Sequence, residues 1–189
     1  MKYLKRIIIP VLLILMSFSL VGCSALKEHQ IKKDAKAYME MKGLISDALE
    51  EYYDMLGRPR YMVAEDIQDD SETSNHNYFY SKLDQAKAIA DTIQSEEFSE
   101  LILMNRKSMI TVREAYMRYS MFCEAMDLYA KDKSIYYDPG FQETYKNCYA
   151  DYQANNQLFD EYYGKAQTVE DYLNEEGVFE GLHWDSEED

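Results

Sequence analysis

Two long apolar stripes between Phe98 and Leu173 constrain the fold of this chain more than any other feature. In each half of the segment, mostly apolar side chains recur in steps of three and four residues, the first half at Phe98, Ile102, Asn105, Met109, Val112, Tyr116, Tyr119, Cys123, Met126 and Ala130. The second half carries Phe141, Tyr145, Cys148, Tyr152, Asn155, Phe159, Tyr162, Ala166, Val169 and Leu173 at the same spacing. Such spacing is one face of an α-helix packed on a partner. The segment 98–173 therefore predicts a long antiparallel helical hairpin.

Two shorter stripes add helices before this hairpin. Apolar side chains at helical spacing begin at Ile31, and Gly57 followed by Pro59 predicts the end of that helix. A second stripe begins at Phe79, and its phase slips before Phe98. The slip argues for a break near 94–96 with Ser95 as N-cap, although one bent helix over 78–131 stays open.

The fold class that follows is all-α, an antiparallel bundle of about four helices. Asp138 and Pro139 are residue types favoured at an N-cap and in the first turn, so we expect the fourth helix to begin there. Residues 58–77 break the pattern and are expected to form a solvated loop. Their acidic half lacks the spacing of a calcium-binding EF-hand loop.

The N-terminus has the features of an export signal. Three basic residues precede an apolar run over 7–20, which is close to the length of a signal-peptide core and shorter than the roughly 20 residues that span a bilayer. The sequence Leu20-Val21-Gly22-Cys23 follows and resembles the lipobox of bacterial lipoproteins. This resemblance implies cleavage before Cys23, a lipid anchor on its sulfur and retention at the cell membrane on the extracytoplasmic side. An uncleaved anchor or an ordinary secretory signal is the alternative.

The expected organisation follows from these segments. It is a lipoprotein signal peptide over 1–22, a tether over 23–30, a helical bundle domain over 31–173 and an acidic C-terminal tail over 174–189. Within the tail, Val178, Phe179, Leu182 and Trp184 are candidates for docking on the bundle, although such acidic composition usually frays.

Cysteine positions predict a covalent link across the hairpin. When the chain folds back at 134–139, Cys123 lies opposite Cys148 and Tyr116 lies opposite Asn155. Closing the loop between the two cysteines would stabilise the hairpin by ~3 kcal/mol in the chain-entropy model. Two buried thiols are the alternative, because free cysteine is a good small core residue. For an exported chain we expect the Cys123–Cys148 disulfide.

The charge of the chain limits its partners. The formal net charge is −15, which argues against nucleic acid and against anionic wall polymers. An envelope protein or a cationic peptide is a compatible partner. Against this background four lysines cluster near the expected anchor, where they either favour an anionic bilayer or pair with the acidic tail: Lys27, Lys32, Lys33 and Lys36.

Catalytic constellations are not evident in the sequence. Di-iron bundles need Glu-x-x-His twice, and this chain has a single copy, Glu180-Gly181-Leu182-His183, in the acidic tail. We therefore expect no cofactor and no metal, and we interpret the chain as a membrane-anchored, non-catalytic binding or scaffold module. The alternative is an extracytoplasmic helical-bundle enzyme or metal-binding protein.

The expected bundle suggests where a partner would bind. In an up-down-up-down bundle, the connections 57–77 and 131–140 lie at the end opposite the anchor. They carry arginines and tyrosines, the residue types in which binding energy concentrates. The predicted partner-binding residues are Arg58, Arg60, Tyr61, Tyr136 and Tyr137, with Met62 and Ile135 beside them. Capping of the core is the alternative role for Ile135 and these tyrosines.

Overall fold

Helices account for all the regular structure that the chain forms in the described ranges. The computed structural model describes residues 2–69, 71 and 74–180, with side chains described from Leu26 onward. Over these residues the elements are α1 (Lys2–Gly57), α2 (Arg60–Ile67), α3 (Asn75–Ala90), η1 (Glu96–Phe98), α4 (Ser99–Lys131), η2 (Lys133–Tyr137) and α5 (Pro139–Glu175), where η denotes a 3₁₀ helix. The predicted all-α helical bundle is confirmed.

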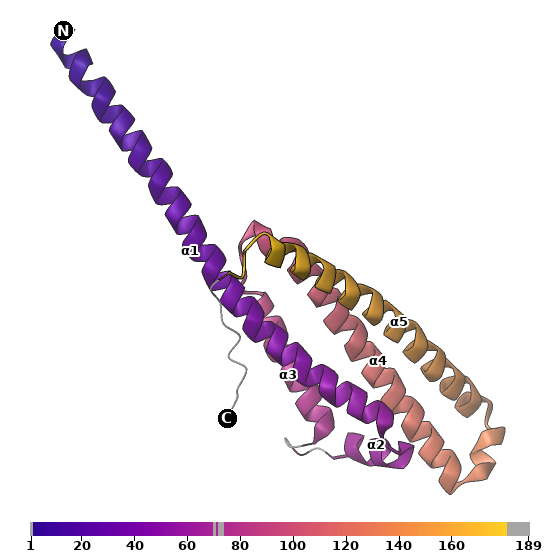
Figure 1. Ribbon diagram of the computed structural model, residues 1–189. Coiled ribbons are helices and arrows are strands. Elements are labelled where there is room, and N and C mark those ends of the chain that lie inside the picture. The colour runs from indigo at the N-terminus through magenta and orange to yellow at the C-terminus, as the bar shows by residue number, and fades with distance from the viewer. Residues whose placement is uncertain (1, 70, 72–73, 181–189) are drawn as a thin grey trace.

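The first helix runs without a break from Lys2 to Gly57. α1 includes residues 23–30, the segment that we expected to be a separate tether. Its N-terminal part extends well beyond the bundle, and its C-terminal part lies beside α3 (Figure 1). The helix ends at Gly57, as the glycine and the following Pro59 predicted. Residues 2–22 thus belong to the same helix as the part of α1 that lies in the bundle.

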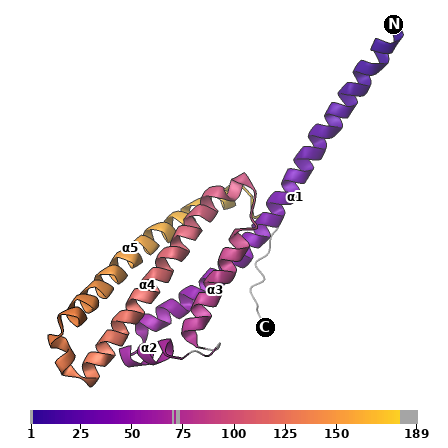
Figure 2. The same ribbon diagram turned by 180° about the vertical axis from the view of Figure 1, so that it is seen from behind.

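Two antiparallel helix pairs build the bundle, α1 with α3 and α4 with α5 (Figure 2). The core between them is rich in aromatic and sulfur-containing side chains, and its largest fully buried members are Tyr38, Tyr52, Tyr116, Phe79, Phe98, Phe159, Met41 and Met55. Tyrosines also carry polar contacts from α1 to α5. The hydroxyl of Tyr38 donates to Glu170 at 2.9 Å, and that of Tyr52 donates to Asn156 at 2.6 Å. The phenol rings are thereby buried while their hydroxyls keep a partner.

The α4–α5 hairpin has the predicted register. The register that sets Cys123 opposite Cys148 also sets Tyr119 opposite Tyr152, and the rings of these tyrosines have centroids 5.0 Å apart and planes 52° apart. The rotation of α4 differs from the expectation, however. Tyr116 does not face Asn155 but stacks on Phe79 of α3, with ring centroids 4.0 Å apart and planes 11° apart. The apolar stripe of α4 is shared among several neighbouring helices.

The predicted Cys123–Cys148 disulfide is wrong. Both thiols are free and buried. Cys123 lies on the part of α4 that also meets α2, where Tyr119 and Arg60 are its neighbours, whereas Cys148 lies beside Arg118. The prediction assumed that the α4 stripe packs on α5 alone. Because α2 and α3 also pack on α4, sequence spacing did not determine which side chains of α4 and α5 meet.

The connections differ from the expectation in one place. Residues 60–67, expected within a solvated loop, form the helix α2, which packs on α4 and buries Val63 and Ala64. Eight residues provide too few apolar positions to show a helical stripe. The break between the second and third long helices is confirmed, since α3 ends at Ala90 and α4 begins at Ser99.

Caps at two helix ends hold the hairpin and the start of the tail. The side chain of Asp138 accepts hydrogen bonds from the backbone N–H groups of Gly140 and Phe141, and Pro139 begins α5, as predicted. At the other end of α5, Gly177 has φ of +75°, and the N–H of Val178 bonds back to the carbonyl of Leu173 at 3.0 Å. This glycine-ended cap directs the following residues back onto the bundle.

The start of the acidic tail therefore docks on the core. Val178 and Phe179 pack against it, and the ring of Phe179 lies 5.6 Å from that of Tyr38 and 5.8 Å from that of Phe98. The other two candidates for docking, Leu182 and Trp184, lie outside the described residues.

Candidate binding surface at the distal end

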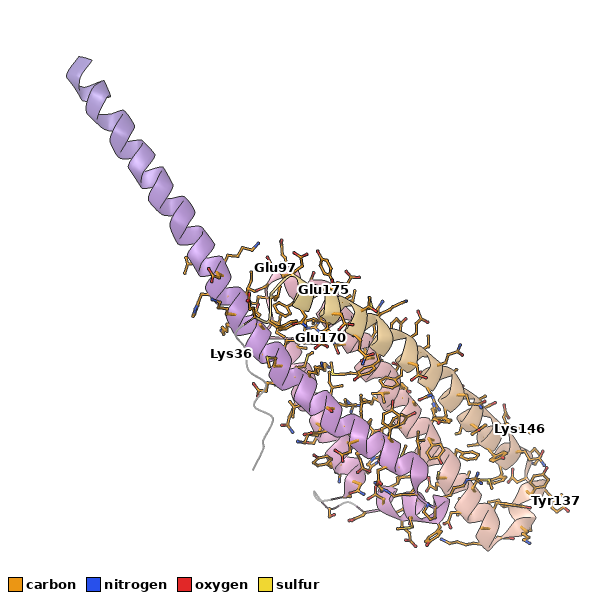
Figure 3. All side chains as sticks on the ribbon, in the orientation of Figure 1. Lys36, Glu97, Tyr137, Lys146, Glu170 and Glu175 are labelled. Atoms are coloured by element: carbon orange, nitrogen blue, oxygen red, sulfur yellow. The ribbon has the colours of Figure 1, made fainter. Side chains whose placement is uncertain are left out.

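The distal end is the end of the bundle opposite the N-terminal extension of α1, and it is built from α2, η2 and the adjoining helix ends (Figure 1). The segments that carry the predicted binding residues all lie at this end. Tyr137 stands at its extreme edge, whereas Glu97 and Glu175 lie near the end from which α1 extends (Figure 3). The expected separation of the two connections from the N-terminal end of the chain is thus present in the fold.

Arg58 is held in an ion-pair network. Its guanidinium pairs with the carboxylates of Glu51 and Asp54, both on α1, and the distance to Asp54 is 2.7 Å. The guanidinium also lies 3.7 Å from the carboxylate of Asp66 on α2. The Arg58 side chain is only 13% exposed. Burial raises the pKa of Glu51, and the neighbouring guanidinium opposes that shift. Arg58 therefore joins the end of α1 to α2, and its charge is matched inside the fold.

A partly buried histidine lies close to this network. His76, at the start of α3, has its ring 5.6 Å from that of Tyr116 and 4.8 Å from that of Tyr80. Its Nδ1 is buried and makes no hydrogen bond within the described part of the chain. Burial lowers the pKa of His76, and the nearby Asp66 opposes that shift. The fold consequently favours the neutral imidazole.

A groove lies between the start of α2 and the C-terminal half of α4. This distal groove has a volume of about 570 Å³ and is lined by Arg58, Pro59, Arg60, Tyr61, Tyr119, Met126, Asp127 and Ala130. Its lining combines aromatic and apolar surface with the charged groups of Arg60 and Asp127. The Asp127 carboxylate is paired with Lys131 at 2.6 Å, so its charge is already matched.

Arg60 is the basic group that the distal groove exposes. Its guanidinium carbon lies 5.2 Å from the centroid of the Phe122 ring, a cation–π arrangement. Tyr61, the next residue, is 54% exposed. Of the predicted binding residues, Arg60 and Tyr61 are thus brought together on one surface.

The other two predicted residues form a separate surface. Tyr136 and Tyr137 belong to η2 at the turn of the α4–α5 hairpin, and Tyr137 is 83% exposed. The Tyr136 ring lies 5.7 Å from that of Tyr129, so it partly covers the end of α4. Neither residue lines the distal groove, and the five predicted residues therefore do not form one pocket.

Four residues of α4 that line the groove were not predicted as binding residues, namely Tyr119, Met126, Asp127 and Ala130. Tyr119, Met126 and Ala130 were assigned to the helical stripe. They become groove residues because α2 places Arg60 and Tyr61 beside them. The available signal was the position of Pro59 before Arg60, because proline commonly starts a helix.

The opposite end of the bundle is organised around a buried carboxylate. Asp34 of α1 is 1% exposed and accepts hydrogen bonds from the backbone N–H groups of Gln94 and Ser95 and from the Ser95 hydroxyl. Ser95 therefore uses its side chain on Asp34, and no capping bond from that side chain to η1 is present. Lys27, one of the four clustered lysines, pairs with Glu97 at 2.7 Å.

The Cys23 side chain, the predicted lipidation site, lies outside the described side chains. Residues 181–183 of the single Glu-x-x-His string also lie outside the described residues. Elsewhere, residues 26–69, 71 and 74–180 contain no group of three or more His, Cys, Asp or Glu side chains arranged to hold a metal ion. Over the same residues no helix is both long enough and apolar enough to cross a membrane.

Comparison of the chain with protein-family models, with curated proteins and with solved structures finds no match.

Proposed function

We propose that this chain is an extracytoplasmic lipoprotein, anchored to the cell membrane through lipid on Cys23, whose helical bundle is a non-catalytic module that binds an envelope protein at its distal end. The anchor rests on the lipobox resemblance. The binding site rests on the groove that presents Arg60 and Tyr61.

The observation that carries this proposal is the placement of the two ends. α1 enters the bundle at one end, and the distal groove lies at the other. The 33 residues of α4 span about 50 Å between those ends at 1.5 Å per residue. A bundle attached by its N-terminal end would hold the groove outward from the bilayer, where an envelope protein can reach it.

Lipid labelling tests the anchor. Cells that express the wild type or Cys23→Ala are grown with a labelled fatty acid, and the protein is recovered and analysed. The proposal requires label on the wild type, mature protein that begins at Cys23, and neither in the variant. Label that persists on Cys23→Ala would overturn the anchor.

Crosslinking in intact cells tests the binding end. The test variant is Arg60→Glu combined with Tyr61→Ala, and the matched control is Lys146→Glu combined with Tyr172→Ala. The control makes an equal change of charge and the same tyrosine change on α5, at a lysine and a tyrosine that are also exposed. We expect the wild type and the control to capture the same envelope protein and the test variant to lose it. Equal capture by all three proteins, each folded by circular dichroism, would place the partner elsewhere.

A further inference from the structure

Arg60 differs from the other arginines whose side chains the structure describes. Four of them have a carboxylate oxygen within 4 Å, namely Arg58, Arg106, Arg113 and Arg118. Arg60 has no such partner among the described residues, although the chain contains 35 acidic residues and 20 basic ones. Among the described arginines, Arg60 alone has no acidic partner, and it lines the distal groove.

The geometry around Arg60 leaves its hydrogen-bond donors accessible. A guanidinium carries five N–H donors in one plane. The Arg60 guanidinium carbon lies 5.2 Å from the centroid of the Phe122 ring, and Arg60 itself is exposed. The groove therefore offers an exposed donor group beside an aromatic and apolar wall.

We propose that the distal groove binds a segment of a partner protein through a carboxylate, which Arg60 receives in a two-pronged hydrogen bond, with an apolar or aromatic side chain of the same segment against Tyr119 and Met126. Planar pairing of arginine with a carboxylate gives both affinity and orientation. The proposal deepens the proposed function, on which its partner rests.

The surroundings select a single carboxylate on a protein over other anions. The net charge of −15 repels polyanions at long range, whereas Arg60 can neutralise one carboxylate locally. Small-molecule sites are usually enclosed clefts. This groove instead opens beside Tyr61 and Met62, which are 54% and 43% exposed. A surface with exposed aromatic and thioether groups next to an arginine matches the composition of protein interfaces.

Selection from a random peptide library tests the proposal without knowledge of the partner. Full-length protein in detergent micelles is the target, and peptides that bind the wild type are sequenced and measured by fluorescence polarisation. Arg60→Gln removes the guanidinium, and Arg60→Lys keeps the charge but loses the planar donors. Arg113→Gln is the matched control, because Arg113 lies 4.7 Å from the Tyr80 ring and is also solvent-accessible, but it is paired with Asp84 and lies outside the groove.

The expected result has three parts. Selected peptides carry Asp, Glu or a free carboxyl terminus next to an apolar residue. Arg60→Gln weakens their binding about tenfold or more, Arg60→Lys gives an intermediate loss, and Arg113→Gln leaves binding unchanged. Changing the peptide carboxylate to an amide weakens binding to the wild type by a similar factor and has no further effect on Arg60→Gln, as expected for two groups in direct contact.

Three results would overturn the proposal. They are the absence of any selected peptide, selected peptides without a shared carboxylate, and equal binding to the wild type and Arg60→Gln. The lipid-labelling test is independent of these outcomes. Unlabelled Cys23 together with Arg60-dependent peptide binding would refute the anchor and keep this site. Labelled Cys23 without Arg60-dependent peptide binding would refute this site and keep the anchor.

Discussion

The carboxylate of Asp34 accepts hydrogen bonds from both the backbone N–H of Ser95, at 2.7 Å, and the hydroxyl of the same residue, at 2.5 Å. Sixty-one positions separate the two residues in sequence. One buried side chain on α1 thus fixes the connection between α3 and α4. Polar groups buried in this way are costly to leave without partners.

Removing the Asp34 carboxylate should therefore destabilise the bundle. We expect Asp34→Ala to lower the free energy of unfolding by about 3 kcal/mol, because buried donors of Gln94 and Ser95 lose their acceptor. Glu28→Ala is the control, since Glu28 is an exposed residue of the same helix that pairs with Lys32, and it should leave stability nearly unchanged. Urea denaturation measures both variants. A loss no larger than that of the control would show that Asp34 does not stabilise the connection.

The same carboxylate should add to acid sensitivity. Burial acts to raise the pKa of Asp34, but hydrogen bonds from Ser95, Gln94 and Gln30 outweigh it and lower the pKa. Because the folded pKa lies below the unfolded value of about 4, the stabilisation is present above that pH and is lost as the pH falls through the folded pKa. The difference in unfolding free energy between the wild type and Asp34→Asn should shrink on acidification. A difference that stays constant from neutral to acidic pH would contradict this linkage.

His76 should make the bundle weaker in mildly acidic solution. Its folded pKa is lowered by burial, so its contribution to stability is fully present above the unfolded pKa of about 6.5 and declines as the pH falls from there towards the folded pKa. Urea unfolding of the wild type across this range should show the decline, and His76→Phe should flatten it. An equally steep decline in the variant would assign the effect to other groups.

The two buried cysteines should resist modification in the native protein. Burial raises the pKa of Cys123 to about 11 and also raises that of Cys148, which leaves little thiolate near neutral pH. We expect an alkylating reagent to modify both residues only after unfolding, as read by mass spectrometry of their peptides. Rapid native labelling, or a linked pair of peptides in the unreduced protein, would contradict this state.

The rotation of α4 can be tested at Tyr116. Tyr116 is 1% exposed and stacks on Phe79, so Tyr116→Ala should cost about 3–5 kcal/mol through lost contacts and a cavity. Asn155 bonds only within its own helix, to the Asp151 carbonyl at 2.8 Å, and Asn155→Ala should cost less than about 1 kcal/mol. Thermal melts compare the two variants. Similar losses would favour the pairing of Tyr116 with Asn155 over the stacking on Phe79.

Long-range periodicity explains which parts of the fold were predictable. The spacing of apolar residues over many turns defines the face of a helix, and Asp138-Pro139 and Gly57 mark helix ends through local chemistry. The pairing of Tyr119 with Tyr152 followed from those signals. The rotation of α4 did not, because it depends on how α2 and α3 share the surface of α4 with α5. For this reason the predicted pairing of Cys123 was wrong.

The candidate site was predictable only in its location. Arginines and tyrosines in the connections indicated the distal end, and topology brought those connections together. Arg58 and Arg60 are near neighbours of the same type in sequence, yet Arg58 is enclosed by Glu51, Asp54 and Asp66 while Arg60 lies over Phe122. Their difference arises from the geometry of α2, which is too short to leave a periodic signal.

The uninterrupted path of α1 has a mechanical consequence for a membrane-anchored bundle. A flexible linker would let the bundle take many orientations relative to the membrane, and the distance between the groove and the membrane would vary widely. A helix that runs through residues 23–30 into the core instead transmits orientation, so tilting at the anchor tilts the groove with it. If Cys23 carries the anchor, the length of the helical bundle, and not that of a linker, sets how far from the anchor the groove can stand.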